Sequence, residues 1–180
     1  YLTERKGPLV LLEALERLTP PVAARITVLL AGRVDPAIRD RIDRSRCRLA
    51  ARHPEIRLHV DDRRLERAEL EYLVARSDVV LAPYQRFVGS SGVLLWAANA
   101  GRPVLAQEYG LVGRLTRDHG LGLAANSSDP ERLAAAITQM VERGPQSFID
   151  QTAAQAFVRS QTPNRFAELV LSGGAASFVT

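Results

Sequence analysis

Hydrophobic residues along the chain alternate between two spacings, which predict short strands separated by helices. A short continuous apolar run over 26–31 is typical of a strand buried on both faces. Further strands are expected at 56–60, 78–82, 103–106 and 121–124. Apolar residues at helical spacing predict helices near 9–18, 36–52, 65–76, 91–100, 111–118, 133–141, 146–160 and 163–171. We expect Pro20 and Pro21 to end the first of these helices.

Strands that alternate with helices of this length predict parallel pairing through right-handed crossovers. The fold class that we expect is therefore α/β, a Rossmann-like doubly wound parallel sheet with helices on both faces. Residues 1–171 are expected to form this domain, and 172–180 to be a tail or linker. In such a sheet, ligands bind beyond the carboxyl ends of the strands.

The loop between the strand 78–82 and the helix 91–100 is the most informative segment for chemistry. Its glycines and serines let backbone N–H groups approach an anion, and the helix directs the positive end of its dipole to the same point. Serines at a helix start also serve as ordinary caps, which is compatible with this role. The residues predicted to bind a phosphate are Gly89, Ser90, Ser91, Gly92 and Val93.

Other loops are expected at the same edge of the sheet, so we predict one pocket. Arg33 is expected to reach the phosphate or to pair with Asp35. Trp96 is interpreted as a core residue, with base stacking as the alternative, and Glu108 as an exposed turn residue or a carboxylate for the ligand. The predicted lining residues are Gly32, Arg33, Asp61, Val88, Trp96, Glu108, Tyr109 and Gly110.

The charge of the chain comes almost wholly from arginine. Of 180 residues, 24 are Lys or Arg and 20 are Asp or Glu, a formal net charge of +4, and Lys6 is the one lysine. A lysine in such an arginine-rich chain is a candidate for phosphate binding because its charge is compact; the alternative is a solvated lysine. Arginines of the helix 36–52 are interspersed with Asp40 and Asp43, which favours a solvated face over a nucleic-acid surface.

Several types of site and segment are not expected. The single Cys47 excludes an internal disulfide and a cysteine-based metal site, and the histidines lack ligand spacing, so we expect no metal and no cofactor. The apolar runs fall far short of the roughly 20 residues of a membrane span. We therefore expect no transmembrane segment and a cytoplasmic location, with peripheral membrane contact left open. Because the loop after Tyr1 has no strand before it, we also expect a fragment of a longer chain.

Several stretches in order along the chain resemble the donor-binding half of family 4 retaining glycosyltransferases. They are Arg5-Lys6-Gly7 with 11–15, 75–83, the turn 101–104, 118–123 and 129–134. The resemblance implies the C-terminal domain of a GT-B enzyme, which binds a nucleotide sugar without a bound metal. The sugar would pass to an acceptor held by an N-terminal acceptor domain.

The resemblance also implies roles for individual residues. Lys6 matches the lysine that contacts the donor diphosphate. Tyr1 stands where the family has an arginine, and Val88 and Trp96 stand where it has glutamates near the donor sugar and on the ribose. The sequence therefore predicts a retaining glycosyltransferase domain or, as the alternative, a degenerate domain that acts as a non-catalytic binding or assembly module. A sugar-nucleotide epimerase is disfavoured because G-x-G-x-x-G is absent.

Overall fold

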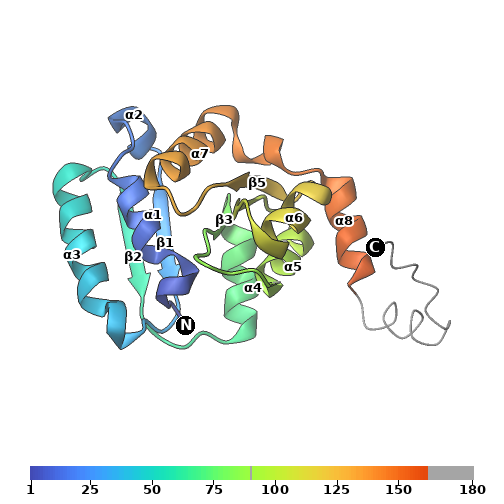
Figure 1. Ribbon diagram of the computed structural model, residues 1–180, viewed down its shortest axis with the longest axis horizontal. Coiled ribbons are helices and arrows are strands. Elements are labelled where there is room, and N and C mark those ends of the chain that lie inside the picture. The colour runs from blue at the N-terminus through green and yellow to red at the C-terminus, as the bar shows by residue number, and fades with distance from the viewer. Residues whose placement is uncertain (90, 162–180) are drawn as a thin grey trace.

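The computed structural model describes residues 1–89 and 91–161, and it confirms the α/β class, with parallel strands and surrounding helices (Figure 1). The predicted helix 163–171 and the tail lie outside these residues. In chain order, the elements are η1 (Glu4–Lys6), α1 (Pro8–Leu15), α2 (Pro20–Ala23), β1 (Thr27–Ala31), α3 (Pro36–Arg52), β2 (Arg57–Asp61), α4 (Arg67–Arg76), β3 (Val80–Ala82), α5 (Gly92–Asn99), β4 (Val104–Gln107), α6 (Gly110–Asp118), β5 (Gly122–Ala125), α7 (Pro130–Arg143), η2 (Pro145–Phe148) and α8 (Gln151–Ser160).

The described strands form two parallel sheets, a division that the sequence did not predict. β1 pairs with β2, with Thr27 opposite Arg57. In the other sheet, β4 lies between β3 and β5. The sequence pattern could not show this division, because the residues of a strand do not identify the strand that lies beside it.

The segment that contains η1 connects the carboxyl ends of the two sheets. The backbone of Leu2 donates a 2.8 Å hydrogen bond to Arg33 and accepts one of 3.0 Å from Asp35, in the loop after β1. The carbonyl of Arg5 accepts a 2.8 Å hydrogen bond from the N–H of Gln85, in the loop after β3. These few residues therefore bring the loops of both sheets together.

Two helix boundaries differ from the prediction. Pro20 and Pro21 begin α2 instead of ending α1. A proline is well suited to a first helical turn because the N–H that it lacks would have no partner there. The predicted helix 146–160 is divided into η2 and α8, because the side chain of Asp150 accepts hydrogen bonds of 2.9 and 3.0 Å from backbone N–H groups and so caps a new helix.

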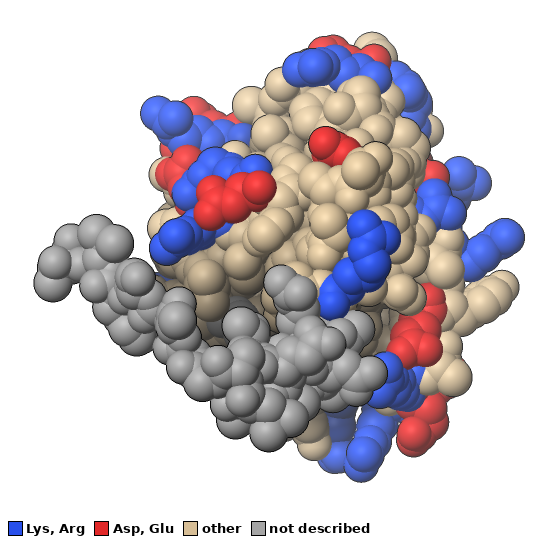
Figure 2. Space-filling view, turned by 90° about the vertical axis from the view of Figure 1, so that its right-hand side faces the viewer, with Lys and Arg blue, Asp and Glu red and all other residues tan. Residues whose placement is uncertain are grey.

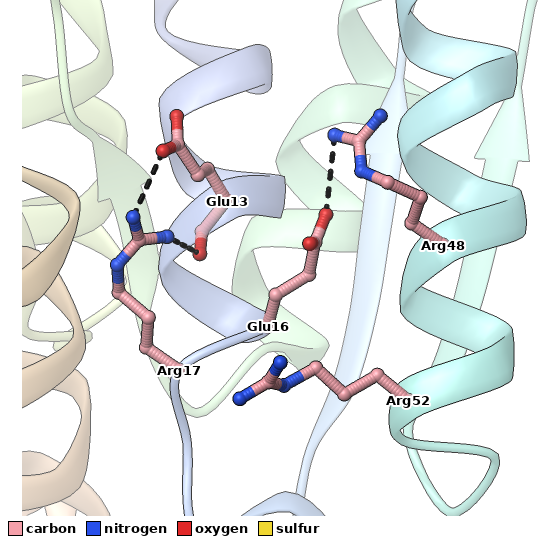
Figure 3. Close-up of a pocket in the computed structure, with 5 residues that line it drawn as sticks. All are labelled: Glu13, Glu16, Arg17, Arg48 and Arg52. Atoms are coloured by element: carbon pink, nitrogen blue, oxygen red, sulfur yellow. Dashed lines mark hydrogen bonds and ion pairs between the residues drawn. The ribbon is translucent and has the colours of Figure 1, made fainter.

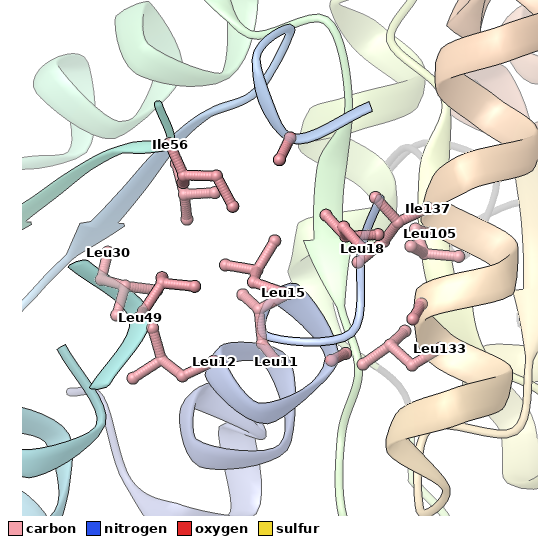
Figure 4. Packing of buried hydrophobic residues seen from close by; sticks show 14 of the residues in the cluster. Leu11, Leu12, Leu15, Leu18, Leu30, Leu49, Ile56, Leu105, Leu133 and Ile137 are labelled. Carbon is pink, nitrogen blue, oxygen red and sulfur yellow. The ribbon is translucent and has the colours of Figure 1, made fainter. Parts of the chain in front are cut away.

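Two sets of buried hydrophobic side chains hold these elements together. The first surrounds α1, which packs against α3 and α7 (Figure 4). Because it contains Leu30 of β1 and Leu105 of β4, both sheets share it. The second set packs β3 and β4 against α5 and α8. Each fully buried leucine contributes about 1.5–3 kcal/mol; in the first set these include Leu12, Leu15, Leu49, Leu105 and Leu133.

Gly7 sits where another residue would collide with the backbone. Its φ is +76°, and a Cβ there would lie 2.0 Å from the carbonyl oxygen of Pro83. We predict that Gly7→Ala lowers the free energy of unfolding by about 2 kcal/mol or more, since left-handed strain and a backbone clash add together. Gly101→Ala is the control, with a φ of +63° but a movable Gln151 side chain as its nearest neighbour. It should lose only about 1 kcal/mol in urea unfolding; equal losses would contradict the prediction.

The carboxylate of Asp62 links the loops that follow β1 and β2. It accepts a 2.8 Å hydrogen bond from the N–H of Val34 and pairs with Arg39, and these contacts hold the pKa of Asp62 below its ordinary value of 3.8. Because the folded pKa is lowered, the stabilisation is present above the unfolded pKa and is lost as the pH falls through the folded pKa. Asp62→Asn should therefore lower the Tm at pH 7. In circular dichroism melts the difference from wild type should shrink below about pH 4; a constant difference would count against this account.

Candidate anion-binding site

Lys6 lies at the end of η1, against the residues that follow β3. Its ammonium donates a 3.2 Å hydrogen bond to the hydroxyl of Tyr84 and lies 4.8 Å from the centre of the tyrosine ring. The close approach of Gly7 to Pro83 sets η1 in this place. The half-buried lysine is therefore held over Tyr84.

The hydroxyl of Tyr84 also contacts the start of α5. Its oxygen lies 2.8 Å from Oγ of Ser91, the N-cap residue, which accepts a 3.5 Å hydrogen bond from the N–H of Val93. A chain of polar contacts thus runs from Lys6 through Tyr84 to the N-terminus of α5. Because the first N–H groups of a helix carry the positive end of its dipole, two sources of positive potential meet here.

The loop before α5 has the small residues that the sequence singled out. Gly92, the first residue of α5, is exposed, and among the described residues no atom beyond its chain neighbours and its own helix backbone lies within 4 Å of the place where its Cβ would be. Gly89 packs beside Phe87, whose ring lies 4.6 Å below the guanidinium of Arg5. Ser90 lies outside the described residues. The helix start is therefore open at Gly92, and a further cation stands next to the loop.

Gln107, at the end of β4, anchors the loop from inside the protein. Its buried amide nitrogen donates hydrogen bonds to the carbonyl of Phe87 and, at 2.9 Å, to that of Tyr109. The carbonyl of Val88 accepts a 3.0 Å hydrogen bond from the N–H of Leu111 in α6. These contacts fix the backbone of residues 87 and 88 against the start of α6.

The carbonyl of Tyr84 is the meeting point of three loops. It accepts hydrogen bonds of 3.2 Å from the hydroxyl of Tyr109, after β4, and 2.9 Å from the hydroxyl of Ser127, after β5. The side chain of Gln85 donates a 2.6 Å hydrogen bond to the carbonyl of Ser127. The carboxyl ends of β3, β4 and β5 therefore converge around one tyrosine.

The predicted pocket residues fall into two groups. Val88, which is 77% exposed, and Gly110 lie with Tyr109 in the cluster around Tyr84. The second group lies at the other sheet, where the N–H of Gly32 donates a 3.0 Å hydrogen bond to the carbonyl of Asp61. The segment 2–6 links the groups. Of the remaining predicted residues, Arg33 and Glu108 are exposed and Trp96 is half-buried.

Sequence reasoning did not select the residues on which the cluster is built. These are Tyr84, Gln107 and Ser127, all buried. One signal was present for the tyrosine, which directly follows Pro83 at the edge predicted to bind ligands, but its burial was not visible in the sequence. A buried tyrosine hydroxyl needs a hydrogen-bond partner, and here it has two.

A hollow of about 430 Å³ lies between α1 and α3, at the end of α1 opposite to Lys6 (Figure 3). Its arginines and carboxylates partly neutralise each other, with pairs of 2.9 Å between Arg17 and Glu13 and 3.3 Å between Arg48 and Glu16. The fifth lining residue is Arg52. The hollow is therefore not the predicted pocket, which belongs to the opposite edge.

Charges on the described surface are mixed. Arginines of α3 pair with acids, Arg41 with Glu4 at 2.9 Å and Arg46 with Asp43 at 3.2 Å. On the face seen in Figure 2, basic and acidic side chains lie beside one another. Within residues 1–89 and 91–161, no three His, Cys, Asp or Glu side chains are grouped so as to hold a metal ion. In the same part of the chain, no helix has the length and apolar character needed to cross a membrane.

Comparison with known proteins assigns the family. A similar fold is seen in HepE from Anabaena in complex with UDP, with 23% sequence identity, a TM-score of 0.72, and coverage of 95% of this chain and 46% of that one. An α,α-trehalose-phosphate synthase (UDP-forming) from Burkholderia vietnamiensis has 17% identity, a TM-score of 0.75, and coverage of 94% of this chain and 42% of that one. Sucrose-phosphate synthase from Thermosynechococcus elongatus has 20% identity, a TM-score of 0.67, and coverage of 94% of this chain and 44% of that one. The chain thus spans less than half the length of these proteins. No curated protein matches the sequence. The model of the family described as "Glycosyl transferases group 1" matches residues 1–143, and the chain belongs to this family.

Proposed function

We propose that the chain is the nucleotide-sugar-binding domain of a glycosyltransferase that transfers a sugar with retention of configuration. The observation that carries this proposal is the link from Lys6 through Tyr84 to Ser91 at the N-terminus of α5. This cluster lies at the carboxyl ends of parallel strands, where α/β folds bind their ligands.

A diphosphate matches the chemistry of the cluster. The Lys6 ammonium has three N–H donors, and the hydrogen bond to Tyr84 uses one of them, which leaves donors for ligand oxygens. The backbone N–H groups of the first turn of α5 supply further donors and the helix dipole. Gly92 keeps the approach to these groups open. The same anion can therefore be contacted by a side-chain cation and by main-chain amides.

The proposed reaction breaks the bond between the anomeric carbon and the donor diphosphate, which keeps the electron pair. An acceptor hydroxyl forms the new bond on the same face of the sugar, and its proton passes to the leaving phosphate oxygen. Lys6 and the start of α5 stabilise the negative charge that develops on the diphosphate. This electrostatic role requires no protein nucleophile in this domain, and we propose that it requires no metal.

The acceptor is proposed to bind to another part of the whole protein. We propose that an N-terminal domain holds the acceptor, so that residues 1–180 alone bind the donor without transferring its sugar. The single cysteine agrees with the cytoplasmic location that we propose. UDP is the first nucleotide to test, because the similar HepE structures hold UDP, UDP with glucose, or UDP-glucose.

A second candidate function is a binding or assembly module without transfer activity. Val88 favours it, because this side chain is 77% exposed on the loop before α5 and cannot accept a hydrogen bond from a sugar hydroxyl. Calorimetry of the complete protein with UDP-, GDP- and ADP-sugars distinguishes the two candidates. Binding of one of these donors supports the transferase, and binding of none supports the module.

Lys6→Ala should raise the Kd of the complete protein for UDP about ten- to a hundredfold. The reason is the loss of a charged hydrogen bond, which is worth roughly 1.5–3 kcal/mol. Lys6→Arg keeps the charge but not its compact shape and should have an intermediate Kd. Arg44→Ala, on the exposed side of α3, is the control and should bind as wild type does. Unchanged UDP affinity in Lys6→Ala, measured by titration calorimetry, would exclude the phosphate role.

A further inference from the structure

We infer that Tyr84 is a positioning residue, whose buried hydroxyl holds the Lys6 ammonium and the Ser91 hydroxyl in place for a nucleoside diphosphate. This inference rests on the proposed function, because both groups that Tyr84 contacts belong to the proposed diphosphate site. It extends that function by assigning a specific role to a residue that would not itself contact the ligand.

The hydroxyl of Tyr84 lies between the two groups that it would position. Tyr84 is 4% exposed, and its oxygen lies between Nζ of Lys6, at 3.2 Å, and Oγ of Ser91, at 2.8 Å. The lysine ammonium also stands 4.8 Å from the centre of the same ring. A free lysine side chain loses rotamer entropy when a ligand immobilises it. A lysine already held by Tyr84 has lost much of that freedom before the ligand arrives.

Tyr84 is itself held in place by its neighbours. Its carbonyl accepts hydrogen bonds from Tyr109 and Ser127, at 3.2 and 2.9 Å, so loops from two neighbouring strands fix its backbone. Its ring meets that of Phe87 edge-on, with centres 5.3 Å apart and planes at 83°. A side chain that positions another must be held by its own neighbours, and Tyr84 meets this condition.

The hydrogen-bonding capacity of the three groups limits which of them can donate and which can accept. The lysine can only donate, so the Tyr84 oxygen accepts from Lys6. The contact between Tyr84 and Ser91 can run in either direction, and the need of the buried Tyr84 hydrogen for an acceptor favours donation to Oγ of Ser91. Oγ of Ser91 also accepts from the N–H of Val93, so both of its lone pairs are engaged. The hydrogen of the Ser91 hydroxyl is therefore left to donate to another acceptor, such as a phosphate oxygen.

Tyr84 thus sets which groups of the cluster donate hydrogen bonds and which accept them. Its hydroxyl accepts from one end and donates to the other, which leaves N–H groups of Lys6 and the O–H of Ser91 as donors for the ligand. A phenylalanine at position 84 would keep the ring and its packing but release the ammonium. The effect of Tyr84 on ligand binding should therefore depend on the presence of Lys6.

A double-mutant cycle on the complete protein tests this dependence. The Kd for UDP is measured by titration calorimetry for wild type, Tyr84→Phe, Lys6→Ala and the double variant. We expect Tyr84→Phe to raise the Kd about three- to tenfold in the wild-type background and less than about twofold in the Lys6→Ala background. Tyr72→Phe deletes the same hydroxyl from a tyrosine of α4 that is 64% exposed, and it should leave the Kd unchanged.

The outcomes separate this inference from the proposed function. If Lys6→Ala weakens UDP binding and Tyr84→Phe does not, the positioning role is overturned and the donor site stands. Equal losses from Tyr84→Phe in both backgrounds also overturn it, since Tyr84 would then act independently of Lys6. If wild type binds none of the UDP-, GDP- and ADP-sugars, the proposed function fails first.

A measurement on the wild-type protein keeps the inference testable if Tyr84→Phe does not fold. With ¹⁵N-labelled lysine, the ammonium signal of Lys6 is assigned by its loss in Lys6→Arg. We expect its hydrogens to exchange with water at least about tenfold more slowly than those of free lysine, because Tyr84 holds the group. Exchange as fast as in free lysine would overturn the positioning role.

Discussion

The hydrogen-bonding requirement of one buried tyrosine organises the loops at the carboxyl ends of β3, β4 and β5. Tyr84 is 4% exposed, so its polar atoms must find partners within the protein. Its hydroxyl forms hydrogen bonds with the side chains of Lys6 and Ser91, and its carbonyl accepts hydrogen bonds from the hydroxyls of Tyr109 and Ser127. Four separate segments of the chain are thereby fixed relative to one another. Displacing the tyrosine would remove one hydrogen bond from each of them.

The core explains how these segments reach the same place. The buried residues around α1 come from both sheets, so the strands of each sheet are held in one body although the sheets are separate. The segment before α1 then crosses between their carboxyl ends, and Gly7 allows it to approach Pro83 closely. The position of Lys6 is therefore a consequence of packing at the start of α1 as much as of its own contacts.

Family membership and local chemistry support different parts of the functional picture. The chain belongs to the glycosyl transferases of group 1, and its fold is shared with larger enzymes of which it spans less than half. The proposal of donor binding depends on a cation and a helix N-terminus that can act on one anion. Such preorganised groups lower a barrier because they need not rearrange when charge develops. The exposed side chain of Val88, on the loop before α5, offers no hydrogen bond to a ligand.

The sequence by itself determined the strands, most helices, the α/β class and the two ends of the polar chain, Lys6 and Ser91. These follow from local spacing and residue type, which do not depend on distant contacts. Only the tertiary structure decided that the strands divide into two sheets, that Gly32 and Asp61 belong to the sheet other than the one that precedes Ser91, and that Tyr84 joins Lys6 to α5. The reason is that strand order and side-chain burial are set by contacts between residues far apart in the chain, such as the 78 positions between Lys6 and Tyr84, and no local pattern records them.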